Sequence, residues 1–325
     1  MVLKVGTIKV EKGHKETGYL LAGETSLGKV EIPITVINGI EPGPKLAMTG
    51  GFHPREYASI ESLTRIANML DPKTIKGGLI IAHIVNTPGF EIRGRKCPID
   101  DGHPINSFPG DPDGPMSKRI AYTIAQEVIS QSDYYIDHHS NDIQWTGPSN
   151  IIFPVIGNDD VDSKSESMGR CFKTDYLRAS IARDANSSLG FAAHKGIPCC
   201  LTEVGSMMGV SSETGLLDEV AMNWNAEGVH NVMKLIGMID DEAYQSTVKP
   251  ITNVIYLRAK HSGIFFPLAE VDKKISEGEP LGEIRDPFGN VKETIVAPFK
   301  GVPSLMTSYM AVTQGVPIIQ MYEIP

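Results

Sequence analysis

The chain has 325 residues, of which 41% are hydrophobic and 21% are charged, the composition of an ordinary globular protein. This length exceeds that of a usual single domain, so we expect one large domain and one small one. The formal net charge of −9 argues against nucleic acid or an anionic membrane surface as a partner.

The compartment is predicted from features that the sequence lacks. The first residues show no charged start followed by a long apolar run, and no apolar stretch approaches the roughly 20 residues needed to span a bilayer. The four cysteines include no Cys-x-x-Cys pair. We therefore expect reduced cysteines in a cytoplasmic protein, without a thiolate metal site.

The N-terminal third predicts strands followed by a strand–helix–strand unit. Residues 18–23 and 30–38 alternate well enough for strands between glycine-rich turns. Residues 45–48 predict a further strand, and 58–70 predict a helix because their apolar residues are spaced as on one helix face. The mostly apolar run at 78–86 predicts a strand buried on both faces.

A polar stretch with little periodicity follows, from residue 86 to residue 110. Loops of this length without regular structure are usually functional or disordered. This stretch contains Arg93 and Arg95 and lies between two apolar runs. We therefore expect it to be functional.

Strands and helices alternate up to residue 240. The sequence predicts strands at 134–139, 151–156 and 196–205, and helices at 117–130, 159–193 and 216–240, the last with Gly228 as a point of interruption. Such alternation from 45 onward predicts a layered α/β fold with a mixed, largely parallel sheet and helices on both faces.

The pattern changes near residue 249, where long helical periodicity ends and turn residues separate short strands. We therefore predict a large α/β domain over 1–248 and a small β-sandwich or barrel over 249–325. Exposed strand edges would allow a homo-oligomer, which the sequence does not decide.

Candidate metal ligands follow the first predicted strand of the α/β unit. His53 and Glu56 lie on the turn where this strand gives way to a helix. In an α/β sheet, ligands bind at this end of the strands. Zinc accepts nitrogen and oxygen ligands together, and a catalytic zinc uses three protein ligands and water. The spacing alone is weak, since His139-x-x-Asp142 matches it as well.

The arrangement of three strand ends strengthens this hypothesis. Asp137, His139 and Glu203 also stand at the ends of apolar strands, and such ends lie side by side in a parallel sheet. Either His138 or His139 could be the third ligand. Successive strand residues point to opposite faces, so we favour His139, with Asp137 on the same face to orient it.

Glu203 is the candidate general base. A carboxylate at the end of an apolar strand is costly unless it has a role or a partner. It could take a proton from zinc-bound water and pass it to a leaving amine. The alternative is a glutamate in a structural salt bridge.

The motifs, taken together in order, resemble those of a known family. The order is His53-x-x-Glu56, Asn86-x-Pro-Gly-Phe90, Arg95, Asn106-Ser-Phe-Pro-Gly110, Asp137-His-His139-Ser140 and Thr202-Glu-Val-Gly205. It resembles the succinylglutamate desuccinylase/aspartoacylase family of zinc carboxypeptidase-like hydrolases, over nearly the whole chain. The resemblance implies one zinc on His53, Glu56 and His139, Glu203 as base, and Arg95 as the residue that stabilises the oxyanion.

Two departures from the family pattern bear on the substrate. Pro54 stands where the family usually has glycine, which a turn can accept. Ile105 and Asn106 stand where the family carries an Asn-Arg pair that grips the substrate carboxylate. Asparagine cannot replace the charge of that arginine. Asn106 is retained as a substrate-binding candidate, with Arg93 and Arg119 as replacement cations, either of which could instead be an ordinary surface residue.

The favoured function is a zinc-dependent amidohydrolase that removes an N-acyl group from a small amine or amino-acid derivative. One alternative is a zinc carboxypeptidase on short peptides, which the missing Asn-Arg pair argues against. A second is a metal-binding relative that has lost catalysis. The partner expected in the favoured case is a small-molecule N-acyl substrate.

Overall fold

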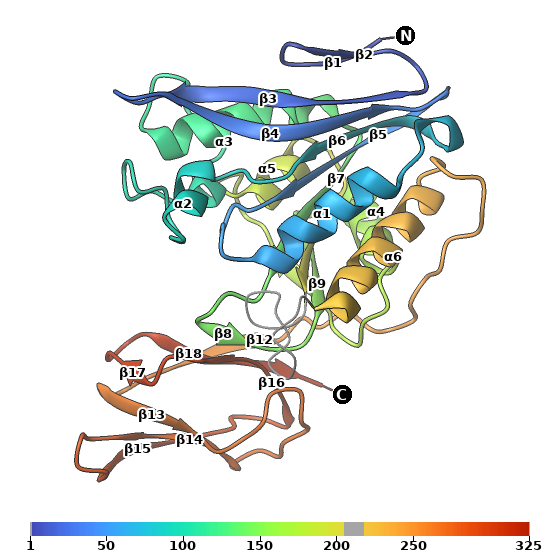
Figure 1. The fold of residues 1–325 in the computed structure, drawn as a ribbon. Helices are drawn as coiled ribbons and strands as arrows, with labels where there is room; N and C mark the ends of the chain where they lie inside the picture. The colour runs from blue at the N-terminus through green and yellow to red at the C-terminus, as the bar shows by residue number, and fades with distance from the viewer. Residues whose placement is uncertain (1, 205–217, 325) are drawn as a thin grey trace.

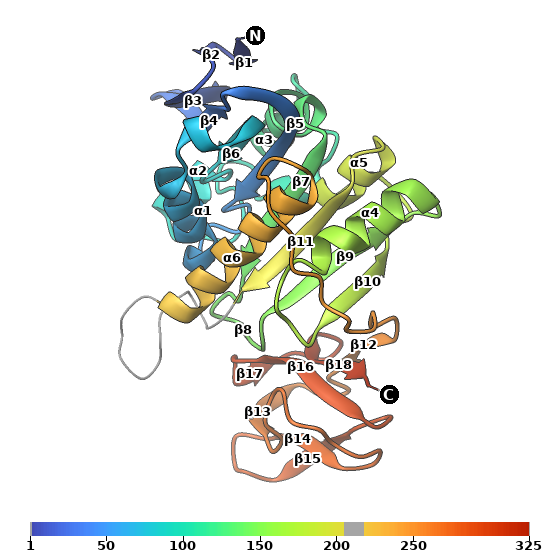
Figure 2. The same cartoon turned by 90° about the vertical axis from the view of Figure 1, so that its right-hand side faces the viewer.

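The centre of the molecule is an eight-stranded mixed sheet. The computed structural model describes residues 2–204 and 218–324. The strand order is β10-β9-β11-β7-β5-β6-β4-β3 (Figures 1 and 2). The middle strands run parallel: β11 beside β7, β7 beside β5, and β5 beside β6. These four strands are β5 (Glu41–Gly50), β6 (Lys76–Ala82), β7 (Tyr134–Ser140) and β11 (Cys199–Val204).

Antiparallel pairs occur toward both edges of this sheet. On one side β4 (Lys29–Asn38) pairs antiparallel with both β6 and β3 (His14–Glu24). On the other side β9 (Asn150–Val155) pairs antiparallel with β11 and parallel with β10 (Leu177–Ile181). A separate hairpin, β1 (Leu3–Val5) and β2 (Ile8–Val10), precedes them. The predicted mixed, largely parallel sheet is therefore confirmed.

Helices cover both faces of the sheet (Figure 2). On one face α1 (Tyr57–Met69) and α6 (Glu219–Leu235) bury a core with Leu63, Ile66 and Val229. On the other, α3 (Met116–Glu127) and α5 (Ser188–His194) bury a second core. The amphipathic spacing of α1 thus places its apolar stripe against the sheet, as the sequence predicts.

Short elements complete this part of the chain. The helix α4 (Asp159–Gly169) begins where the Asn158 side chain accepts hydrogen bonds from two backbone N–H groups, and three aspartates occupy its first turn, where the helix dipole favours negative charge. The other short helices are α2 (Thr87–Glu91) and the 3-10 helices Pro72–Thr74, Pro104–Asn106 and Ile129–Gln131.

The structure corrects three sequence predictions. Residues 159–193 are not mostly helical, because β10 separates α4 from α5; this five-residue edge strand is stabilised by its ladder with β9 and a bridge to Ile251. The stretch 86–110 is not without regular structure, since it contains α2 and a 3-10 helix. Finally, α6 continues through Gly228 without interruption, although the predicted start at 216 lies outside the described residues.

The C-terminal strands form two four-stranded antiparallel sheets with a core of their own. One has the order β12-β18-β16-β8 and the other β15-β14-β13-β17. Because β8 (Trp145–Thr146) pairs with β16, the first sheet includes a strand from the earlier part of the chain, and the division at residue 248 stays a prediction. The remaining bounds are β12 (Val254–Arg258), β13 (Gly263–Pro267), β14 (Pro280–Arg285), β15 (Val291–Val296), β16 (Gly301–Thr307), β17 (Ala311–Val312) and β18 (Pro317–Glu323).

The register of the large sheet determines which side chains meet at its carboxyl edge. Gly50 of β5 pairs with His138 of β7, and His139 pairs with Glu203 of β11. The ends of three parallel strands therefore lie side by side. Within the described part of the chain, no helix is both long and apolar enough to cross a membrane.

The continuity of α6 gives a test of the packing. A Cβ added to Gly228 would lie 1.9 Å from the ring of Phe172, which is fully buried. Alanine normally favours a helix by about 1 kcal/mol over glycine, whereas overpacking a core costs about 1–3 kcal/mol. Because this contact is so close, the cost should lie at the upper end of that range, and we expect Gly228→Ala to lower the free energy of unfolding by about 1–2 kcal/mol, measured by urea denaturation.

Asn223→Ala, on the exposed face of the same helix, is the matched control and should leave stability unchanged or slightly higher. A Gly228→Ala variant as stable as the wild type would show that α6 does not pack tightly on Phe172.

Candidate active site

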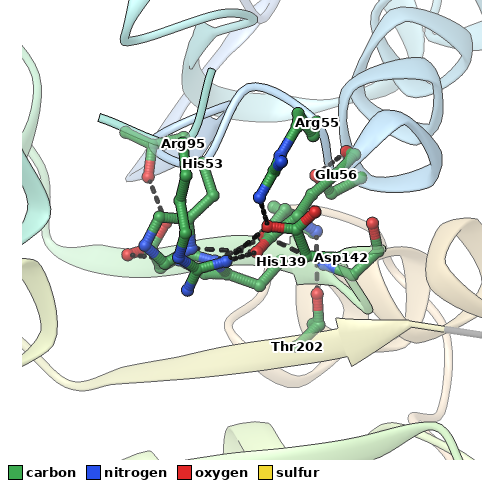
Figure 3. Close-up of polar contacts among 12 residues, drawn as sticks. His53, Arg55, Glu56, Arg95, His139, Asp142 and Thr202 are labelled. Carbon is green, nitrogen blue, oxygen red and sulfur yellow. Dashed lines mark hydrogen bonds and ion pairs between the residues drawn. The ribbon is translucent and has the colours of Figure 1, made fainter. Parts of the chain in front are cut away.

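Two imidazoles and a carboxylate converge at the carboxyl edge of the sheet. His53 and Glu56 stand between β5 and α1, and His139 stands near the end of β7 (Figure 3). Each can offer one ligand atom, and these atoms lie within 4.8 Å of one another. The sequence predicted this grouping from strand ends, and the parallel register of β5 and β7 brings it about.

Glu56 is the centre of this group. Its side chain is buried, with Oε1 2.9 Å from His53 Nδ1 and Oε2 2.8 Å from His139 Nδ1. The backbone N–H of Ser140 also donates to Oε2, at 3.2 Å. Burial alone would raise the pKa of Glu56, but the two imidazoles hold it well below its ordinary value. The carboxylate therefore stays ionised.

The two histidines respond to their surroundings in opposite ways. Burial lowers the pKa of His53, although Glu56 opposes that shift. Burial also acts to lower the pKa of His139, but Glu56 and Asp137 together raise it well above its ordinary value. The raised pKa favours the protonated form of His139, beside the carboxylates of Glu56 and Asp137. A metal ligand must be deprotonated, so a bound cation would take the place of this proton. The donor set therefore fits a metal ion.

Asp137 lies behind His139, on the side away from Glu56. Its Oδ2 is 3.4 Å from His139 Nε2, while Thr49 donates to Oδ1 at 2.8 Å. Burial would raise the pKa of Asp137, but His139 and hydroxyl donors lower it. This arrangement turns Nδ1 of His139 toward the triad, as a carboxylate behind a metal-binding imidazole does.

His138 points to the opposite face, toward α6. Its Nδ1 lies 3.1 Å from Asn225 Oδ1 and 3.3 Å from Thr202 Oγ1. Burial lowers the pKa of His138 to about 4. The adjacent histidines therefore differ as strand alternation predicts: one lies in the triad, and the other is a neutral histidine packed under a helix.

Glu203 faces a cavity beside the triad. The cavity has a volume of about 170 Å³, and Glu56 and Arg95 line it as well. Burial and the Glu56 carboxylate raise the pKa of Glu203 to about 7. Among the described residues Glu203 has no ion pair with a lysine or arginine, which argues against the structural salt bridge. The other lining residues are Ser140, Asn141, Asp142, Trp145, Tyr256 and Leu305.

Arg95 reaches the triad from the loop after α2. Its Nη1 donates to Asp142 Oδ2 at 2.8 Å and lies 3.5 Å from Glu56 Oε1. Arg55 Nη2 donates to the same Asp142 oxygen, also at 2.8 Å. Arg55 and Asp142 have no predicted role in the sequence motifs. Their positions in the chain could have indicated one, because Arg55 lies between two predicted ligands and Asp142 follows His139 by three residues.

None of the three predicted substrate-binding residues lines the cavity beside the triad. Arg93 is exposed, with a positive φ of 56°, and Asn106 is exposed at the end of a 3-10 helix. Arg119 of α3 donates to the Gly114 carbonyl and packs beside Gly23 of β3, the far edge strand. His103, which sequence reasoning did not single out, has its ring centroid 6.4 Å from that of His53. Gly205 of the last motif lies outside the described residues.

Comparisons with known proteins identify similar sequences and similar folds. A curated relative, the N-alpha-acetyl-L-2,4-diaminobutyric acid deacetylase of Halomonas elongata, is 26% identical over an alignment of 295 residues that covers 86% of this chain and 82% of that protein. Among solved structures, product-bound ectoine utilization protein EutE (DoeB) from Ruegeria pomeroyi has a TM-score of 0.86 at 20% identity, covering 98% of each chain.

A succinylglutamate desuccinylase from Silicibacter sp. TM1040 has a TM-score of 0.84 at 21% identity, covering 99% of this chain and 100% of that one. At these identities the solved structures establish the fold. The model of the succinylglutamate desuccinylase/aspartoacylase catalytic domain matches residues 42–236, which is more than half of the chain. The protein therefore belongs to the succinylglutamate desuccinylase/aspartoacylase family.

Proposed function

We propose that this protein is a cytoplasmic, zinc-dependent amidohydrolase that removes an N-acyl group from a small amine or amino-acid derivative. The observation that carries the proposal is that Glu56, the central member of the His53–Glu56–His139 triad, lines one small cavity together with Glu203. Family membership supports amide hydrolysis, and the Halomonas relative is a deacetylase.

The metal would be held by His53, Glu56 and His139, one ion per chain. Two imidazole nitrogens and a carboxylate oxygen suit zinc, although related transition metals accept similar ligands. When bound, zinc would polarise the amide carbonyl and lower the pKa of a water molecule.

Glu203 would be the general base and then the general acid. Its raised pKa suits both tasks at neutral pH, because the group can accept a proton from the attacking water and release it again. The proton then goes to the leaving nitrogen as the amide C–N bond breaks. A carboxylic acid and an amine are the products.

Arg95 would stabilise the oxyanion that develops on the carbonyl oxygen. It lines the cavity 3.5 Å from a triad oxygen, so its positive charge lies where negative charge forms. The cavity volume of about 170 Å³ favours a small substrate over a long peptide. Because neither Ile105 nor Asn106 supplies a cation, we infer that the substrate is not held by the family's Asn-Arg pair.

Metal content tests the ligand set. We expect about one zinc ion per wild-type chain, measured by inductively coupled plasma mass spectrometry, and its loss in His53→Ala and in His139→Ala, since each removes one of three ligands. His230→Ala, an exposed histidine of α6, should keep the metal. A metal-free wild type, or metal unaffected by either ligand change, would contradict the site.

The base is tested by Glu203→Gln, which keeps the shape of the side chain but cannot accept a proton. The kcat should fall by about 10²- to 10⁴-fold, because general acid–base catalysis contributes about that much, while zinc content stays unchanged. Glu227→Gln, exposed on α6, should leave kcat unchanged. Retained turnover in Glu203→Gln would rule out this mechanism.

The substrate class is tested with a panel of N-acetyl amino acids, N-acetyl-2,4-diaminobutyrate and dipeptides of similar size. We expect kcat/KM for at least one N-acyl compound to exceed that for every dipeptide by about tenfold or more, which is about 1.4 kcal/mol of transition-state stabilisation. Faster cleavage of dipeptides would favour a carboxypeptidase. Zinc binding without turnover of any amide would favour a non-catalytic relative.

A further inference from the structure

We propose that Asp142 is a positioning residue that holds the Arg95 guanidinium at the cavity wall and keeps it off the metal-binding carboxylate of Glu56. The inference rests on the proposed function, because it concerns the metal site and the oxyanion-stabilising arginine. It assigns a role to an acid that follows His139 by three residues but is not one of the three ligands.

Both carboxylate oxygens of Asp142 accept hydrogen bonds from nearby residues (Figure 3). Its Oδ2 accepts hydrogen bonds from Arg95 Nη1 and Arg55 Nη2, each at 2.8 Å. Its Oδ1 accepts the backbone N–H of Ile143 at 2.6 Å. The Asp142 side chain is only 1% exposed, so these bonds fix its position.

Arg95 stands between two carboxylates. It is 2.8 Å from Asp142 and 3.5 Å from Glu56 Oε1, the oxygen that also contacts His53. Guanidinium groups favour bidentate pairing with a carboxylate. Without Asp142 as the nearer acceptor, Arg95 would close on Glu56 and occupy the oxygen lone pairs that a metal ion needs. Asp142 therefore keeps Glu56 available.

Arg55 holds Asp142 in turn. Its side chain is 16% exposed, and it does not line the cavity. Pairing a buried carboxylate with two guanidiniums offsets the cost of its burial, and losing one partner leaves charge uncompensated. Arg95 uses only Nη1 in its hydrogen bonds and ion pairs with described residues, so its other nitrogens keep donors for the reacting carbonyl.

A double-mutant cycle on zinc affinity tests the inference without a known substrate. Asp142→Asn keeps the shape of the side chain and removes its charge. Measured by competition with a chromophoric chelator, we expect it to raise the zinc Kd by about tenfold or more, as loss of a supporting partner does in other metal sites. In an Arg95→Gln background the same change should raise the Kd by less than about threefold, because no guanidinium remains to close on Glu56.

Asp160→Asn, an exposed acid paired with Lys164, is the control and should not change the zinc Kd. An unchanged Kd in Asp142→Asn would overturn the inference. So would an equal loss with and without Arg95, because Asp142 would then act by its charge or by folding alone. If Asp142→Asn does not fold, Arg55→Gln replaces it in the same cycle, with a smaller increase expected and the same criterion.

The outcomes separate this inference from the proposed function. A wild type that binds zinc and hydrolyses N-acyl compounds, with additive effects in the cycle, overturns only the role of Asp142. A wild type that binds no zinc overturns both.

Discussion

The site depends on one buried carboxylate. Glu56 lies between two imidazoles and receives a backbone N–H, and it remains ionised because these groups replace the water that it has lost. Its partners come from β7 and from the turn after β5. A change in register between these strands would leave the charge unpaired in a low-dielectric interior, so the register of the sheet and the chemistry of the site are linked.

Two further aspartates near the triad are paired with basic side chains. Asp137 lies behind His139 and turns its imidazole toward the triad, whereas Asp142 contacts Arg95 and Arg55 at the cavity. Each attracts a basic side chain, His139 or Arg95, that would otherwise pair with Glu56 alone. Among the described residues Glu203 has no ion pair with a lysine or arginine, and burial and the Glu56 carboxylate raise its pKa to about 7.

The cavity requires both parts of the chain. Trp145 of β8, Tyr256 of β12 and Leu305 of β16 line it opposite the triad. The pairing of β8 with β16 joins the loop after His139 to the C-terminal sheet. This loop therefore connects β7 to the cavity wall that the C-terminal sheet provides. The cavity that the two parts enclose has a volume of about 170 Å³.

The sequence by itself determined the elements whose pattern is local: the apolar run of β6, the amphipathic α1, and the candidate metal ligands at the strand ends, of which strand alternation favoured His139 over His138. Tertiary structure decided what depends on distant partners. β10 forms because β9 offers it a ladder, Gly228 admits the Phe172 ring, and Asp142 meets Arg55 and Arg95 across 87 and 47 residues of sequence. Periodicity reports which face a residue occupies, but pairing between distant side chains arises only when the chain has folded.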